Sequence, residues 1–151
     1  PVMRTHEGNR PEVNWQYDSD LHTLESFARL THIHTMLAPY ARAASGEYQS
    51  TGIPLMRPVF LHYPGSRTIN LQYEYLYGRD LLVAPVYKPR KKKWKLYLPD
   101  DQWVHLWSGI PVSGGRIIIE DSPLGYPPVY YRKSSQYREL FQEIGKQYGG
   151  V

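Results

Sequence analysis

The pattern that most constrains the fold is a series of short apolar segments, separated by turn residues, in the second half of the chain. Apolar and polar side chains alternate most clearly from Lys93 to Leu98, as expected for a strand with one buried face. Similar segments follow, and Gly, Pro, Ser and Asp residues stand between them. We expect strands at 93–98, 103–107, 116–120 and 129–132. Short antiparallel strands at this spacing predict a β-sandwich.

The first half of the chain has the periodicity of helices. Asp20 can cap a helix that begins at Leu21, and apolar residues then recur along it at spacings of three and four. Pro39 would interrupt this helix, so a second helix is expected to begin there. Gly52 supplies a stop signal for the second helix. The sequence therefore predicts two consecutive helices before Gly52.

Four further segments complete the expected order of elements. Residues 53–63 contain two prolines, which remove ladder donors and favour an irregular or edge strand. Residues 70–77 have the spacing of one or two helical turns, whereas the apolar run 81–86 is typical of a strand buried on both faces. A last helix is expected from Ser134 or Ser135, with its apolar side packed on the sheet.

The composition limits the class of protein. The 151 residues suffice for one core, but a complete (β/α)8 barrel needs about 250 residues. Because the chain begins Pro-Val-Met, we expect the C-terminal piece of a larger protein. It has no Cys, which excludes disulfides and thiolate metal sites and is compatible with the cytoplasm. No apolar run reaches the roughly 18 residues of a transmembrane helix, and the net charge of +4 is too mild to indicate nucleic acid.

A dense group of polar side chains follows two apolar residues at the start of the chain. Val2 and Met3 are typical of a buried strand, and Arg4-Thr5-His6-Glu7-Gly8-Asn9-Arg10-Pro11 comes directly after them. Arg4 and His6 are two residues apart, so an extended backbone points both to one face. In barrels of alternating strands and helices, the loop after a strand carries the active site. The residues alone leave open an ordinary loop whose polar side chains meet water.

Longer segments resemble glycoside hydrolase family 31, the family of retaining α-glucosidases and α-xylosidases. "PVMRTHEGNRPEVNWQ" is similar to the family's last barrel strand and loop, and three later segments continue the resemblance over nearly the whole chain. These are "GRDLLVAPV", "WKLYLPDDQWVHLWSG" and "SPLGYPPVYYRKSSQYRELF". The family's α-glucosidases usually have Arg-Asn-His-Asn where this chain has Arg4-Thr5-His6-Glu7. That departure is similar to the sulfoquinovosidase branch, which cleaves glycosides of 6-sulfo-quinovose.

The resemblance implies a fold of α/β plus all-β class in a fragment of a larger chain. Residues 1–52 would be the last strand and helices of a (β/α)8 TIM barrel, at the end of the catalytic domain. Residues 53–151 would form a C-terminal antiparallel β-sandwich domain with a terminal helix. The fragment would pack on the missing upstream barrel.

The resemblance also implies which residues contact substrate. Arg4 and His6 keep the family's positions, where the His contacts hydroxyls of the sugar in the cleaved subsite. Glu7 is expected to orient Arg4 or a substrate hydroxyl, and Arg10 is either a further cation or a solvated side chain. Retaining glycosidases need two carboxyl groups about 5 to 5.5 Å apart, and the resemblance places both catalytic Asp residues upstream of Pro1. No catalytic residue is therefore expected within this chain.

The expected partner is a carbohydrate substrate, an α-glycoside and possibly a sulfoquinovoside. We expect the full-length protein to hydrolyse it in the cytoplasm, without a cofactor, a metal, nucleic acid or a membrane. The fragment alone is expected to be inactive.

Two patterns invite other kinds of binding. His22, His32 and His34 could suggest a metal, but His32 and His34 lie on different sides of a helix, so we expect no metal site. The basic run from Lys88 to Lys95 could bind a nucleic acid backbone. We favour a hairpin turn whose lysines are solvated and protect an edge strand.

A third pattern bears on an alternative function, in which the β-sandwich binds carbohydrate or a partner without catalysis. Trp103, His105 and Trp107 alternate, so all three would share one face of a strand. Exposed rings would suit a non-catalytic carbohydrate-binding or interaction β-sandwich, whereas buried rings would belong to the core, which we favour. The exposure of Trp103 and Trp107 distinguishes these two functions.

Overall fold

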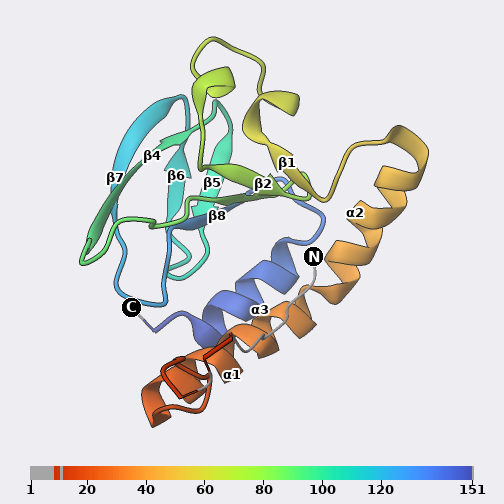
Figure 1. The fold of residues 1–151 in the computed structure, drawn as a ribbon. Coiled ribbons are helices and arrows are strands. Elements are labelled where there is room, and N and C mark those ends of the chain that lie inside the picture. The colour runs from red at the N-terminus through yellow and green to blue at the C-terminus, as the bar shows by residue number, and fades with distance from the viewer. Residues whose placement is uncertain (1–8, 11, 151) are drawn as a thin grey trace.

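The computed structural model describes residues 9–10 and 12–150, and its elements form a mostly antiparallel β structure with three helices against it (Figure 1). The helices are α1 (Leu21–Met36), α2 (Ala38–Thr51) and α3 (Arg138–Tyr148). The strands are β1 (Met56–Pro58), β2 (Tyr75–Tyr77), β3 (Leu81–Val83), β4 (Lys93–Leu98), β5 (Gln102–His105), β6 (Pro111–Ser113), β7 (Arg116–Asp121) and β8 (Val129–Arg132). Two short 3-10 turns, η1 (Val59–Leu61) and η2 (Thr68–Asn70), lie between β1 and β2.

The strands form two sheets that pack face to face. The larger sheet has the order β1-β2-β3-β8-β5-β6, and β4 pairs with β7 in a separate ribbon. All of these pairs are antiparallel. β1 lies at one edge, as the two prolines of residues 53–63 predicted. The predicted antiparallel β-sandwich is thus observed in residues 56–132.

Two apolar clusters lie on the two faces of the larger sheet. One fills the space between that sheet and the β4–β7 ribbon, and its members include Leu82, Leu96 and Trp103. The other lies between the sheet and the three helices, and it includes Leu81 and Phe141. Leu81 and Leu82 are adjacent and fall in opposite clusters, so β3 is buried on both faces as predicted.

The two N-terminal helices form where the sequence predicted them. The Asp20 side chain accepts a hydrogen bond from the Thr23 N–H and caps α1. Pro39 lies in the first turn of α2, and Gly52 ends it in the left-handed conformation. Ile33 of α1 and Tyr40 of α2 belong to the same core cluster as α3. These helices therefore pack against the β-structure within this chain.

Three predictions about elements need correction. Residues 70–77 are not helical after η2, because Leu76 pairs in register with Arg57 and Leu82, and this pairing outweighs the local periodicity. Trp107 lies beyond the end of β5 and packs in the cluster opposite to Trp103, so the two rings do not share a face.

The terminal helix begins at Arg138 rather than at Ser134 or Ser135. The Ser135 hydroxyl accepts from the Tyr137 N–H and donates to a carboxylate, so it stabilises a turn before the helix. Within the part of the chain that the structure describes, no helix is long and apolar enough to cross a bilayer.

Candidate functional site

The predicted substrate-binding residues Arg4, His6 and Glu7 lie outside the described residues. Residues 12–19 fold back on the start of α1. The backbone turns at Arg10, whose carbonyl accepts from the N–H groups of Val13 and Asn14. The Trp15 indole then donates to the Thr23 hydroxyl at 3.1 Å, and the Asp20 cap also holds Thr23. Residues 12–23 thus fix where the chain enters α1.

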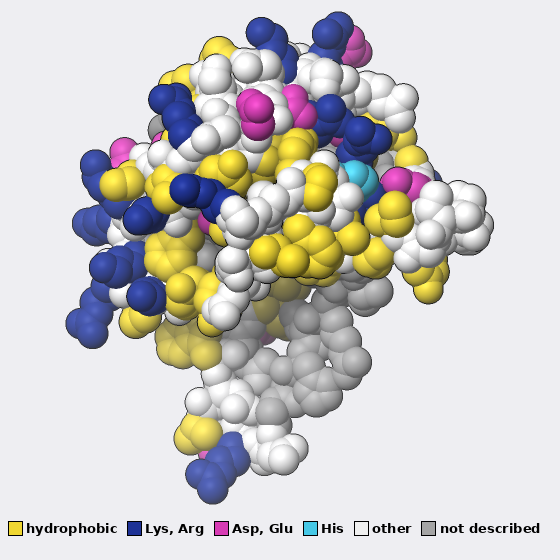
Figure 2. All heavy atoms as spheres, turned by 90° about the horizontal axis from the view of Figure 1, so that it is seen from above, with side chains coloured by type: hydrophobic (Ala, Val, Ile, Leu, Met, Phe, Trp, Pro, Cys, Tyr) yellow, Lys and Arg dark blue, Asp and Glu magenta, His cyan; other side chains and the backbone are white. Residues whose placement is uncertain are grey.

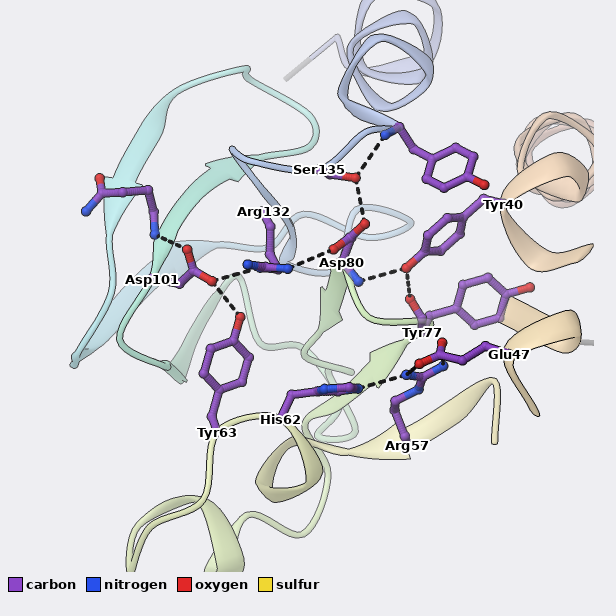
Figure 3. A network of polar contacts seen from close by, with 12 residues as sticks. Tyr40, Glu47, Arg57, His62, Tyr63, Tyr77, Asp80, Asp101, Arg132 and Ser135 are labelled. Atoms are coloured by element: carbon purple, nitrogen blue, oxygen red, sulfur yellow. Dashed lines mark hydrogen bonds and ion pairs between the residues drawn. The ribbon is translucent and has the colours of Figure 1, made fainter. Parts of the chain in front are cut away.

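A set of polar residues joins the helices to the sheet, and we call it the polar network (Figure 3). Its members come from α2, from strands β1 and β8, from connections between strands and from the turn before α3. They are Tyr40, Glu47, Arg57, His62, Tyr63, Asp80, Asp101, Arg132 and Ser135.

Tyr40 connects α2 to the turn between β2 and β3. Its hydroxyl donates to the Tyr77 carbonyl at 2.7 Å and accepts from the Asp80 N–H at 2.8 Å. Burial raises the pKa of Tyr40, so the phenol stays protonated. A Cβ on Gly78 would lie 2.2 Å from this hydroxyl, so the contact needs the glycine at position 78.

Arg57 connects the edge strand β1 to α2. Its side chain has no exposed surface and forms an ion pair with Glu47, at 2.9 Å between Nη2 and Oε2. Nε donates to the Pro54 carbonyl, and Nη1 lies 2.8 Å from His62 Nε2. A guanidinium can only donate, so this His62 nitrogen must be the unprotonated acceptor. Burial and the charge of Arg57 lower the pKa of His62, in agreement with a neutral ring.

Arg132 of β8 lies between two carboxylates. Nη1 is 3.3 Å from Asp80 Oδ1, and Nε is 2.8 Å from Asp101 Oδ2. The hydroxyls of Tyr63 and Ser135 donate to Asp101 and Asp80 respectively. Burial opposes the charge on Asp101, but the hydrogen bonds from Arg132 and Tyr63 outweigh it and lower its pKa. The arrangement is a charge-assisted clamp between strands and the start of α3.

The polar network is suited to positioning rather than to bond cleavage. Asp80 and Asp101 share Arg132, and Glu47 is paired with Arg57. A general acid needs a raised pKa and a free path to the substrate, whereas the pKa values of Asp101 and Glu47 are lowered. Among the described residues, no group of His, Cys, Asp and Glu side chains could hold a metal ion.

A second polar cluster lies between the larger sheet and the ribbon. His105 packs on the Tyr130 ring, at 5.0 Å between centroids, and its Nδ1 lies 2.8 Å from the Ser108 hydroxyl. Burial lowers the pKa of His105. The Tyr130 hydroxyl donates to Glu120 of β7. This carboxylate is therefore also occupied by a structural contact.

The two tryptophans of the segment 103–107 belong to the core. Trp103 has no exposed surface and Trp107 has 7%. Their indoles donate to the carbonyls of Pro99 and Pro127. Burial of both rings counts against the carbohydrate-binding alternative, which needs them on the surface.

Comparison with known proteins identifies the family. A profile of the glycosyl hydrolase family 31 C-terminal domain matches residues 52–135. The chain belongs to glycosyl hydrolase family 31. The family resemblance in the sequence is thereby confirmed. The match covers the β-sandwich and the residues that join it to α2 and α3, including most of the polar network.

Individual relatives share more than the profile. The chain is 48% identical over 145 residues to a sulfoquinovosidase of Escherichia coli (strain K12). This match covers 95% of this chain and 21% of that protein. It is 32% identical to a 1,3-alpha-isomaltosidase of Kribbella flavida, over 93% of this chain and 21% of that protein. A solved family 31 sulfoquinovosidase from E. rectale, in complex with an aza-sugar inhibitor, superposes with a TM-score of 0.93 at 49% identity. That match covers 97% of this chain and 22% of the solved chain.

The family 31 chain described here thus spans about a fifth of the length of these relatives.

The polar network was missed by the sequence interpretation. One signal was present, because Arg57 stands alone between apolar and proline residues in 53–61. A lone cation in such a run indicates a buried ion pair. The partners of Arg132 lie 31 and 52 residues away, so local pattern could not indicate them.

Proposed function

We propose that this chain is the C-terminal part of a retaining α-glycoside hydrolase of the sulfoquinovosidase type. The observation that carries the proposal is the difference in identity among relatives of similar coverage. The chain is 48% identical to the Escherichia coli sulfoquinovosidase but 32% identical to the 1,3-alpha-isomaltosidase. The departure of the first loop from the usual Arg-Asn-His-Asn pattern supports the same branch.

In this proposal, residues 1–52 complete the catalytic TIM barrel and residues 53–151 form the C-terminal β-sandwich domain. The rest of the barrel lies upstream and packs on this part of the protein. Exposed apolar side chains on α1 agree with such a partner, since Leu21 is 69% exposed and Leu24 is 40% exposed. The absence of Cys fits a cytoplasmic enzyme.

The chain's own contribution to catalysis is substrate binding by its first loop. Arg4 and His6 would bind hydroxyls of the cleaved sugar, and Glu7 would orient Arg4 or a hydroxyl. The nucleophile and the acid/base would be Asp residues upstream of Pro1. Such hydrogen bonds increase kcat when they strengthen as the sugar ring distorts toward the transition state.

In this proposal, the contacts of the polar network would help to position the first loop. Residues 12–23 fix the start of α1, and the Tyr40 and Arg57 contacts hold α2 against the sheet. A substrate-binding group must stay within a fraction of an ångström of its productive place. We infer that the β-sandwich serves as the rigid support for the last part of the barrel.

The experiment compares the full-length protein with the 151-residue chain on 4-nitrophenyl α-sulfoquinovoside. The proposal predicts release of nitrophenol by the full-length protein and none above background by the chain alone. Proton NMR of the first product should show the α anomer, because a retaining mechanism uses two displacements. Turnover by the isolated chain would contradict the assignment of the catalytic pair to upstream residues. A β product would contradict the retaining mechanism.

A further inference from the structure

An apolar groove lies beside the base of the β4–β7 ribbon. It is open to solvent, has a volume of about 1380 Å³, and is bounded by the segments 83–92 and 121–127. Its floor and walls include Val83, Pro85, Val86, Pro123 and Leu124. Leu124 is 88% exposed. A concave surface with this lining binds ligands that have an apolar body.

The groove has an ordered aromatic wall. The Tyr87 ring lies 4.1 Å from the Tyr73 ring and 4.9 Å from the Trp94 ring, between centroids. Tyr87 is nevertheless 51% exposed. Its position is therefore fixed by neighbours while part of the ring remains available. A wall that is already ordered reduces the entropy lost when a ligand binds.

The rim of the groove is strongly cationic. Lys88, Arg90, Lys91 and Lys92 all line it and all are exposed. Basic side chains gather on the side of the molecule formed by β4 and β7, which lies at the left in Figures 1 and 2. Within residues 9–10 and 12–150, none of these four cations forms an ion pair.

The acidic side chain at the groove has a cationic partner. Asp121 is the acidic residue among the lining side chains, and it lies 3.6 Å from Lys93 Nζ. The turn that presents the cations is held against the opposite wall, because the Ser122 N–H donates to the Lys92 carbonyl at 2.7 Å. Within the turn, Arg90 has φ 59°, which is unusual for a residue other than glycine.

We propose that this groove binds a single-chain anionic amphiphile, such as a medium-chain carboxylate or sulfonate. The apolar body occupies the space between 83–87 and 123–127, and the anionic head lies against the four cations of the turn. A free sugar fits less well, because it needs many polar partners where the walls are apolar. A nucleic acid would need a series of exposed rings for its bases, whereas Tyr87 is the exposed ring among the residues that line the groove.

The test is photolabelling of the full-length protein with a diazirine derivative of decanoate, followed by peptide mapping. The label is expected on peptides within 83–92 and 121–127, and unmodified decanoate should compete for it. The matching decanol derivative, which has no charge, should label these peptides about tenfold less. Added salt should weaken labelling by decanoate but not by decanol.

Two matched triple variants separate the local charges from the net charge. Arg90→Gln/Lys91→Gln/Lys92→Gln should weaken labelling about tenfold, the combined effect of three surface charges. Arg42→Gln/Lys133→Gln/Lys146→Gln removes the same charge from exposed positions that do not line the groove, and should change labelling less than about twofold. Leu124→Ser should also weaken labelling, because it removes apolar contact without a change of charge.

Several results would overturn the proposal. Label that maps outside the two segments would place the amphiphile elsewhere. Equal labelling by decanoate and decanol, or equal loss in both triple variants, would remove the role of the basic turn. Binding to vesicles of phosphatidylglycerol without labelling by free decanoate would indicate a bilayer surface instead of a single-chain ligand.

Discussion

Replacement of Arg132 by Met tests whether the polar network holds the sandwich together. The guanidinium is the shared partner of Asp80 and Asp101, at 3.3 and 2.8 Å. Loss of one partner from a buried ion pair costs about 3 to 5 kcal/mol, because a buried charge is left without compensation. The three side chains retain 12 to 20% exposure, so water screens part of this cost. We therefore expect unfolding of the 151-residue variant to require about 2 to 3 kcal/mol less.

The pH dependence separates loss of charge from loss of packing. In the wild-type chain the pKa of Asp101 lies below its ordinary value. Its contribution to stability is therefore present above about pH 4 and is lost as the pH falls through the folded-state pKa. In the variant Asp101 is left without its cation, so its pKa rises. The loss of stability in the variant then appears as the pH rises above about 4, where an unpaired carboxylate would ionise.

The assay is urea unfolding followed by tryptophan fluorescence, since Trp103 and Trp107 are both buried. The difference between variant and wild type should fall from about 2 to 3 kcal/mol at pH 7 to about 1 kcal/mol or less near pH 4. Arg42→Met is the control, because Arg42 is exposed on α2 and should cost less than about 0.5 kcal/mol. A small loss at pH 7, or a loss that is equal at both pH values, would refute this role of Arg132.

Three further predictions concern single positions. Gly78→Ala places a Cβ 2.2 Å from the Tyr40 hydroxyl at φ 61°, and it should lower the free energy of unfolding in thermal denaturation by about 2 kcal/mol or more. Gly46→Ala is the control, because Gly46 lies inside α2 with nothing near its Cβ, and it should be neutral or stabilising. Equal effects of the two substitutions would contradict the contact between Gly78 and Tyr40. Burial raises the pKa of Glu74 to about 7, so the folded protein prefers the protonated carboxyl. The protein therefore loses stability as the pH rises from about 4.5 to 7. Glu74→Gln should therefore stabilise the chain by about 1 to 3 kcal/mol at pH 8 and much less at pH 4 in urea titrations, and a benefit that is the same at both pH values would be inconsistent with a buried carboxylate. His6→Ala in the full-length protein should lower kcat/KM by roughly 10 to 100-fold without a change in Tm, and normal kinetics in a folded variant would remove His6 from the site.

Much of the fold could be predicted because its determinants are local. The Asp20 cap, Pro39 in the first turn of α2 and the left-handed Gly52 each act within a few residues, and each was placed correctly. Strands β4, β7 and β8 also followed from alternation and turn residues. The segment 70–77 was misassigned because the pairing of Leu76 with strands on both sides outweighs its helical spacing.

The site was less accessible to sequence reasoning. Arg57 reaches Glu47 across ten residues, and Arg132 reaches Asp80 across 52, so only the fold brings these charges together. The substrate-binding roles of Arg4, His6 and Glu7 remain predictions that rest on family resemblance. The groove beside the ribbon also depends on distant segments, since 83–92 and 121–127 meet only when β4 pairs with β7.

We propose that this chain belongs to an enzyme selective for sulfoquinovosides. A sulfonate is ionised at any working pH, so its pocket must supply cations and donors in a partly dry place. Such a pocket rejects an analogue without the charge, because its own cations are left unmatched. The decisive measurement is kcat/KM of the full-length protein for 4-nitrophenyl α-sulfoquinovoside and for 4-nitrophenyl α-glucoside. We predict a preference for the sulfoquinovoside on the order of 10³-fold or more; equal values, or faster cleavage of the glucoside, would contradict the claim.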